Sequence, residues 1–332
     1  MATVTLYVRI GSAECEQARL DLDGLQGEFP HQLVVVNIDT DPVVKDEYAA
    51  IVPVADIGPY RLKAPFDVKM LRVALGAAID RHRQLEGTGN AAYKARIQRG
   101  HNLTKADRFS FWFTKHYMLL LNLIIMIYVG LPFLAPVLMK VVATAPARII
   151  YAVYSPLCHQ LAFRSWFLFG EQSAYPRALA NVPGLITYEQ AIGPDTDIAA
   201  ARNFIGNNII GYKVAFCQRD VAIYGSILLF GLFFSVTKKW LKSPPWYVWV
   251  AIGILPIAID GFSQLPSLMT GINNIKWLPI RESTPFLRTL TGFLFGASTA
   301  WYGYPFIEES IRETRRVLVQ KIAVVTQSGN KA

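Results

Sequence analysis

The sequence is poor in charged residues, and the shortage is concentrated in its second half. Only 17% of the 332 residues are Asp, Glu, Lys or Arg, against about a quarter in a typical soluble protein. Four segments contain no charged residue, and they are residues 117–139, 221–237, 243–259 and 289–307. A helix needs about 20 apolar residues to cross a bilayer. We therefore expect an integral membrane protein, preceded by a soluble region at residues 1–115.

Motifs of several common protein classes are also missing. The sequence contains no glycine-rich nucleotide-binding loop, no haem-attachment Cys-x-x-Cys-His and no metalloprotease His-Glu-x-x-His. Three cysteines are too few for a disulfide scaffold, and no basic segment of a cleaved signal peptide opens the chain. The histidines expected at surfaces or interfaces are His31, His82, His101 and His116. Without a complete catalytic motif, the sequence does not favour an enzyme.

The net charge of +9 raises the question of nucleic acid binding. The basic residues instead cluster beside hydrophobic segments, where anionic lipids and the positive-inside rule account for them. Residues 89–116 form a basic connector with a group of aromatic residues, typical of a helix at a membrane surface. Its basic residues are Lys94, Arg96, Arg99, Lys105, Arg108 and Lys115. We therefore expect a lipid bilayer, and no nucleic acid, as the partner of these charges.

Residues 1–88 alternate between strand and helix patterns. Continuous apolar, β-branched runs predict strands, and apolar residues at helical spacing predict helices. The predicted strands are at residues 4–10, 33–38 and 52–57, and the predicted helices are at 12–25, 42–50 and 66–81. This order predicts a small α/β sandwich.

The strand–turn–helix at residues 6–18 and the Val52-Pro53-Val54 step resemble glutaredoxin-like members of the thioredoxin fold. The resemblance covers about residues 3–85 and makes Pro53 a candidate for that family's cis-proline. The family's Cys-x-x-Cys aligns with Ser12 and Cys15, so a hydroxyl replaces the attacking thiol. The resemblance implies a redox-inactive docking domain. Cys15 is then either an inert relic or a thiol that acts alone in a mixed disulfide.

Residues 117–306 are expected to form a helical membrane domain with about four spans. The predicted spans are at residues 117–139, 220–236, 245–262 and 286–306. Residues 149–163 are apolar but short and contain a proline, which predicts a re-entrant or interfacial segment. Residues 171–213 are expected to form an extracytoplasmic loop, and residues 307–332 an amphipathic tail.

Positive charge beside the spans predicts their orientation. The relevant residues are Lys238, Lys239 and Lys242 between two spans, and Arg312, Arg315 and Arg316 after the last span. If these faces are cytoplasmic, both termini and the α/β domain lie in the cytoplasm. Cys158 and Cys217 then face the other side of the membrane.

Two short motifs mark the membrane half, Cys158-His159-Gln160 and Cys217-Gln218-Arg219-Asp220. Together with later elements around Asp260 and Arg288, they resemble a bacterial membrane-protein family classed as a domain of unknown function. The resemblance covers residues 147–305. It implies a multi-pass protein of the bacterial inner membrane and assigns no chemistry.

Sulfur-bearing and ionisable residues at a membrane edge are costly unless they pair, bind a ligand or react. Cys158, His159, Cys217 and Asp220 form a ligand set suited to zinc or copper(I). The two cysteines can instead form a disulfide on the oxidising side of the membrane, or remain as packed free thiols. These alternatives stay open at the level of the sequence.

Other polar residues recur at the ends of the predicted spans. They are Gln160, Arg164, Arg219, Asp260, Gln264, Arg281 and Arg288. We expect them to converge, either as buried ion pairs that fix helix register or as a polar cavity for an anion, a metal ion or a headgroup. Gly292 and Gly296 share one helical face and would permit close helix contact.

These features favour a membrane accessory or scaffold protein, a subunit of a larger membrane complex. Its thioredoxin-like domain would dock a cytoplasmic partner or another membrane subunit. The alternative is a membrane thiol-redox or metal-binding protein that uses Cys158, His159 and Cys217. A small-solute transporter is a further alternative, although four spans without internal repetition suit alternating access poorly.

Overall fold

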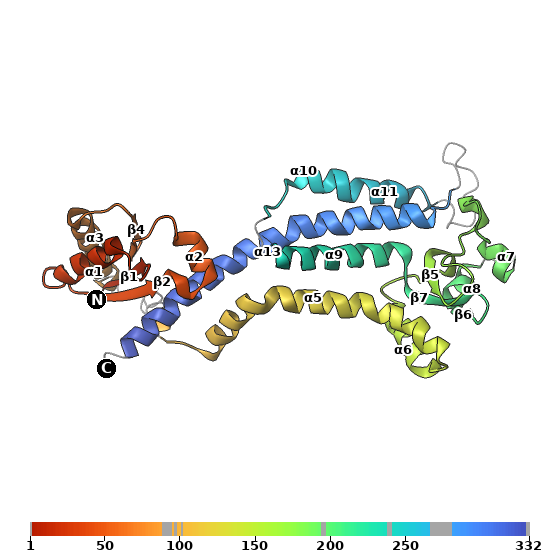
Figure 1. The fold of residues 1–332 in the computed structure, drawn as a ribbon, viewed down its shortest axis with the longest axis horizontal. Coiled ribbons are helices and arrows are strands. Elements are labelled where there is room, and N and C mark those ends of the chain that lie inside the picture. The colour runs from red at the N-terminus through yellow and green to blue at the C-terminus, as the bar shows by residue number, and fades with distance from the viewer. Residues whose placement is uncertain are drawn as a thin grey trace. The chain divides into compact units, whose positions relative to one another are not determined.

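The computed structural model describes residues 2–87, 95, 98–100, 102–193, 197–237, 241–265 and 281–329. The chain divides into two compact units. Figure 1 shows the fold with colour running from red at the N-terminus to blue at the C-terminus. The α/β unit comprises Met1–His116 and Glu309–Ala332, and the helical unit comprises Tyr117–Glu308. Five basic residues named above lie outside the described residues, namely Lys94, Arg96, His101, Lys238 and Lys239.

The α/β unit is built on a four-stranded mixed sheet. Its strands are β1 (Ala2–Val8), β2 (His31–Asn37), β3 (Val54–Ile57) and β4 (Tyr60–Lys63). The strand order is β2-β1-β3-β4, in which β1 and β2 are parallel and the other pairs are antiparallel. This sheet confirms the predicted α/β class and is compatible with a thioredoxin fold. Strand β4 has no counterpart among the predicted strands.

The helices of this unit begin at residues that satisfy their first backbone N–H groups. They are α1 (Ala13–Gly24), α2 (Pro42–Tyr48) and α3 (Val68–Gly87). The Ser12 side chain caps α1, and the Asp41 carboxylate caps α2 by accepting the Val43 N–H at 3.0 Å. Pro42 occupies the first turn of α2, where it has no donor to lose. The Val52–Pro53 peptide bond is cis.

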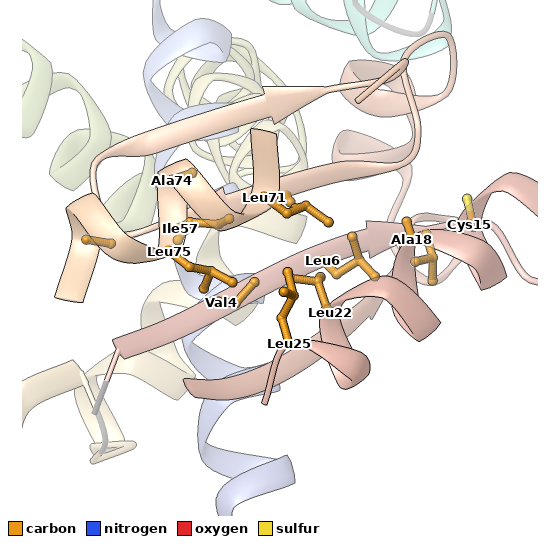
Figure 2. Packing of buried hydrophobic residues seen from close by; sticks show 13 residues of the cluster. Val4, Leu6, Cys15, Ala18, Leu22, Leu25, Ile57, Leu71, Ala74 and Leu75 are labelled. Carbon is orange, nitrogen blue, oxygen red and sulfur yellow. The ribbon is translucent and has the colours of Figure 1, made fainter. Parts of the chain in front are cut away.

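One face of the sheet packs against α1 and α3, as Figure 2 shows. Leu6 from β1, Leu22 from α1 and Leu71 from α3 are fully buried in this core. Burying one such side chain stabilises a fold by about 1.5–3 kcal/mol. Cys15 lies in the same cluster.

The opposite face of the sheet is covered by α2 and by the last part of α13 (Pro285–Gly329). Val324 of α13 packs in one buried cluster with Val36 and Tyr48. Gln327 pairs with the backbone of Val35, accepting its N–H at 3.0 Å and donating to its carbonyl at 2.7 Å. Residues 309–329 therefore complete the α/β unit and do not behave as an independent tail.

The helical unit contains apolar helices of different lengths, of which α5 begins within the α/β unit. They are α5 (Lys105–Lys140), α6 (Thr144–Tyr154), α9 (Gln218–Val236), α10 (Trp246–Trp249), a π-helical stretch (Val250–Ile254), α11 (Leu255–Phe262) and the first part of α13. Among the described residues, α5 and α9 are long and apolar enough to cross a bilayer, and Trp246–Phe262 is a shorter apolar helix. Large apolar side chains such as Ile124 and Leu229 are 63% exposed. Such a surface fits contact with lipid tails.

Glycines bring the helices of this unit close together. Helix α9 lies between α5 and α13 (Figure 1), and a side chain at Gly231 would overlap Asn122 of α5. A side chain at Gly292 or Gly296 of α13 would overlap backbone atoms of α9. The predicted close contact at these two glycines is confirmed.

Residues 161–193 and 197–217 fold into a small cap at the ends of these helices. Its elements are the 3-10 turns Ala162–Arg164 and Ala178–Ala180, the strands β5 (Ser165–Leu168), β6 (Gly206–Asn207) and β7 (Gly211–Cys217), and the short helices α7 (Tyr188–Ile192) and α8 (Ile198–Asn203). The strands form an antiparallel sheet in the order β5-β7-β6. Phe163, Tyr175 and Tyr188 fill its core. The segment expected to be a loop, residues 171–213, is thus largely folded.

Candidate metal centre and its polar surroundings

Cys158, Cys217 and Asp220 meet where β7 passes into α9. Their possible ligand atoms, the two Sγ atoms and a carboxylate oxygen, all lie within 4.8 Å of one another. Cys158 follows the end of α6, and Cys217 is the N-terminal capping residue of α9. Both cysteines are free thiols. The structure therefore places two thiols and one carboxylate in a single cluster.

Backbone N–H groups point at both sulfurs of this cluster. The Cys217 N–H donates to the Cys158 Sγ at 3.3 Å, and the Asp220 N–H donates to the Cys217 Sγ at 3.4 Å. Both donors belong to the N-terminal end of α9, at its capping residue Cys217 and in its first turn. The hydrogen bond with Cys217, burial and the charge of Asp220 raise the pKa of the Cys158 thiol well above its usual range.

The two residues after Cys158 differ in burial, and neither belongs to the cluster. His159 is exposed and is not part of the cluster. Gln160 is buried, and its side chain donates to the Tyr151 carbonyl at 2.9 Å. The sequence suggested four metal ligands. The structure brings Cys158, Cys217 and Asp220 together and leaves His159 outside.

Lys213 is a buried cation beside this cluster, and the sequence interpretation above does not include it in the site. It lies on β7 and is 1% exposed. Its ammonium group donates to the carbonyls of Gln160 at 2.7 Å and Arg202 at 2.6 Å. Burial lowers the pKa of Lys213 to about 7. The signal in the sequence is one lysine within the apolar run that ends at Cys217.

A network of charged groups surrounds Asp260, which is 3% exposed. Arg219 of α9 forms an ion pair with its carboxylate, and Arg281 approaches it at 3.2 Å. The Ser283 hydroxyl donates to the same carboxylate at 3.1 Å, and the Gln264 amide donates to the Asp260 carbonyl at 2.6 Å. The Asp260 carboxylate thus has several partners that compensate for its burial.

Glu282 is the second buried acid of this region, and it is absent from the residues expected in the network. Arg164 binds it with two parallel hydrogen bonds of 2.8 and 3.0 Å, and Arg288 forms a second ion pair with it. Arg288 also donates to the Gln264 side chain at 3.0 Å, which links the Glu282 and Asp260 groups. Six of the seven residues expected to converge therefore do so. Gln160, the seventh, contacts Lys213 instead.

The thiol of the α/β unit has a different environment. The Ser12 hydroxyl, at the position of the missing thiol, accepts the Cys15 N–H at 3.5 Å. Cys15 is 3% exposed, and its sulfur accepts the Arg9 N–H at 3.4 Å. These contacts are those of a structural helix start with a buried thiol.

Comparisons with known proteins support a membrane assignment. Residues 200–302 match a family described as Predicted membrane protein (DUF2085). An uncharacterized protein of Methanocaldococcus jannaschii is 27% identical over 205 residues, which cover 59% of this chain and 96% of the relative. No solved structure matches. The family match includes Cys217, Asp220 and Asp260, and neither description assigns an activity.

Proposed function

We propose that this chain is a multi-pass membrane protein that binds a thiophilic metal ion, zinc or copper(I), at Cys158, Cys217 and Asp220. The closeness of two thiols and one carboxylate, within 4.8 Å, carries the proposal. Thiolates are the ligands that zinc and copper(I) prefer, and carboxylates also bind zinc. The N-terminus of α9 and its backbone N–H groups would stabilise the thiolates.

The dimensions of the cluster are compatible with a single metal ion. Two sulfurs at about 2.3 Å from one tetrahedral zinc ion lie about 3.8 Å apart, a separation that the 4.8 Å limit on the ligand atoms of this cluster allows. The three residues would leave a fourth position for water or another ligand. A zinc site with three protein ligands and an open position is typical of sites that exchange or activate a bound molecule. The nearby ammonium group of Lys213, which interacts electrostatically with Cys158, would offset part of the charge of two thiolates.

We place the proposed site on the extracytoplasmic side of a four-span protein of the bacterial inner membrane. The spans would be residues 117–139, 220–236, 245–262 and 286–306, with both termini in the cytoplasm. Outward-facing apolar side chains on α5 and α9 support the first two spans. The arginines Arg312, Arg315 and Arg316 support a cytoplasmic position for the segment after α13 leaves the membrane.

The α/β unit suggests a second role, as a docking domain of an accessory subunit. Ser12 serves as a helix cap and Cys15 is buried, so neither provides an exposed attacking thiol. A thioredoxin-like fold without that chemistry retains a surface on which partners can bind.

Elemental analysis of the purified full-length protein tests the metal site. We expect about one zinc or copper ion per chain in the wild type and in Cys15→Ser, because Cys15 lies in the other unit. Cys158→Ser and Cys217→Ser should retain less than a tenth of this metal, and Asp220→Asn should bind it more weakly. An intact mass two hydrogens below the reduced chain would indicate a disulfide and a thiol-redox role instead. Stoichiometric metal in the Cys158→Ser, Cys217→Ser double variant would also contradict the proposal.

A further inference from the structure

The two edges of the four-stranded sheet differ in how they are covered. At the β2 edge, the Gln327 side chain occupies the N–H and C=O groups of Val35, and Ser328 accepts a hydrogen bond from Gln32. Strand β4 forms the other edge and pairs only with β3 among the described strands. An uncovered edge strand presents a row of backbone groups that can pair with another chain.

An apolar groove lies directly beside the uncovered β4 edge. It has a volume of about 390 Å³ and is lined by β4 and α3, through Tyr60, Leu62, Lys69, Met70, Val73 and Ala77. Val73 is 72% exposed and Met70 is 46% exposed. Exposed apolar side chains next to a free strand edge are typical of sites that bind an extended peptide, whose alternate side chains enter the groove.

We propose that this groove binds an extended segment of a partner protein in which apolar residues alternate with acidic residues. The segment would pair with β4 and place its apolar side chains between β4 and α3, near Lys69. Its alternate, acidic side chains would point to the other face of the sheet, where Lys63 lies opposite Val54. The inference rests on the docking role proposed for the α/β unit and names the surface and the chemistry of the partner.

The charges beside the groove select an acidic partner. Arg61 of β4 is paired with Asp56, at 2.6 Å. Lys63 and Lys69 have no ion pair among the described residues. An ammonium group in the groove, that of Lys69, and a second one on the other face of the edge strand, that of Lys63, are complementary to carboxylates on the bound segment.

The same charges disfavour two other occupants. A second copy of the chain would pair β4 with β4 and bring Arg61 and Lys63 close to their own counterparts, which is destabilising. The basic connector, residues 89–116, would bring Arg99 and other cations to the same lysines. Charged residues on a strand edge commonly prevent self-association in this way while leaving the edge open to a complementary chain.

Site-specific photo-crosslinking of the full-length protein in cells tests the proposal. A photoreactive phenylalanine analogue would replace Val73 in the groove or, as a control, Leu20, which is 54% exposed on α1. We expect a crosslink at position 73 and none at position 20. Mass spectrometry of the crosslinked peptide should identify a segment of another protein with alternating apolar and acidic residues. A crosslink to a second copy, to the connector or to a segment without acidic residues would overturn the proposal.

Charge reversal provides the second measurement. The Lys63→Glu, Lys69→Glu double variant, combined with the photoreactive group at position 73, should lose at least nine-tenths of the crosslink. An unchanged yield would overturn the role of the lysines and hence the choice of partner. A crosslink at position 20 alone would leave the docking role intact and refute the groove, whereas no crosslink at either position would refute both.

Discussion

In the α/β unit the large apolar side chains lie between the sheet and its helices, whereas in the helical unit many of them lie on the surface. Leu71 is 0% exposed in the first unit, and Ile124 is 63% exposed in the second. The helical unit also buries more ionisable side chains, namely Lys213, Asp260, Glu282, Arg288 and Glu308, against His31 and Asp41 in the α/β unit. The comparison indicates that the first unit is built for water and the second for an apolar surrounding.

The cysteines repeat this contrast on a smaller scale. Cys15 and Cys217 both lie at the start of a helix. Cys15 is enclosed by apolar residues of the sheet core, whereas Cys217 faces another thiol and a carboxylate. A thiol at a helix start is therefore no sign of chemistry by itself, and its neighbours decide whether it can bind a ligand.

The largest loss of stability is expected from Glu282→Ala in the helical unit. This change leaves Arg288 buried without its carboxylate and removes both bonds to Arg164. We expect a loss of about 3–5 kcal/mol in the free energy of opening measured by hydrogen exchange in α13. Glu189→Ala, which removes a more exposed pair with Arg177, serves as the control and should cost less than about 1 kcal/mol. Equal losses in the two variants would refute a buried network.

The next largest difference in stability is expected between alanine variants of apolar residues in the two units. Leu71→Ala should destabilise the α/β unit by about 2–5 kcal/mol, because it opens a cavity in a closed core. Ile124→Ala should change the stability of the helical unit by less than about 0.5 kcal/mol, since its side chain faces outward. Hydrogen exchange of the full-length protein in lipid nanodiscs measures both. A loss at Ile124 as large as that at Leu71 would show that α5 is covered by protein.

A smaller effect is expected where α13 contacts α9. Gly296→Ala should cost about 1–3 kcal/mol, because the added methyl group overlaps the Ile223 carbonyl and the Ser226 hydroxyl. Gly303→Ala on the same helix is the matched control, since nothing lies within 4 Å of its new methyl group. That control should be neutral or stabilise the helix by up to about 1 kcal/mol. Thermal unfolding in detergent distinguishes the two, and a neutral Gly296→Ala would contradict the close contact.

The smallest effect concerns an ion pair of the α/β unit. Hydrogen bonds from Lys321 and Thr104 lower the pKa of Asp107 to about 2. A carboxyl group with a lowered pKa contributes stability above its unfolded pKa of about 3.9, and this contribution is lost as the pH falls through about 2. Lys321→Ala should therefore cost less than about 1 kcal/mol at pH 7 and flatten the loss of stability between pH 4 and pH 2. Hydrogen exchange at pH 7 and pH 3 measures this change. An unchanged pH dependence of stability in Lys321→Ala would contradict the role of the ion pair.

The parts of the fold that were predictable have local causes. Continuous β-branched runs identified β1 and β2, and the helix predicted at residues 42–50 corresponds to α2. The uncharged segments identified α5 and α9, since a bilayer imposes a composition that is visible along the chain. The Cys158 and Cys217 motifs pointed to the cluster because thiols and acids are rare beside apolar segments.

The parts that were missed depend on residues far apart in the sequence. Glu282 is one acid next to one arginine in the sequence, and only folding brings Arg164 and Arg288 to it. Lys213 reads as an ordinary loop charge until β7 carries it to two carbonyl groups. His159 has the side chain of a metal ligand, but the turn after α6 exposes it. Periodicity and composition contain no information about such long-range neighbours.

Because residues 309–329 cover one face of the α/β sheet, that sheet cannot acquire its final hydrophobic packing while the ribosome is still making the helical unit. Roughly 200 residues separate the two parts of the α/β unit, so at about 5–20 residues per second the delay is on the order of 10–40 s. During this interval Val36 and Tyr48 lack the cover that Val324 later provides. Membrane insertion of the helical unit can therefore begin before the α/β unit is complete. A translation arrest after α11 would leave the apolar face of the sheet exposed to chaperones.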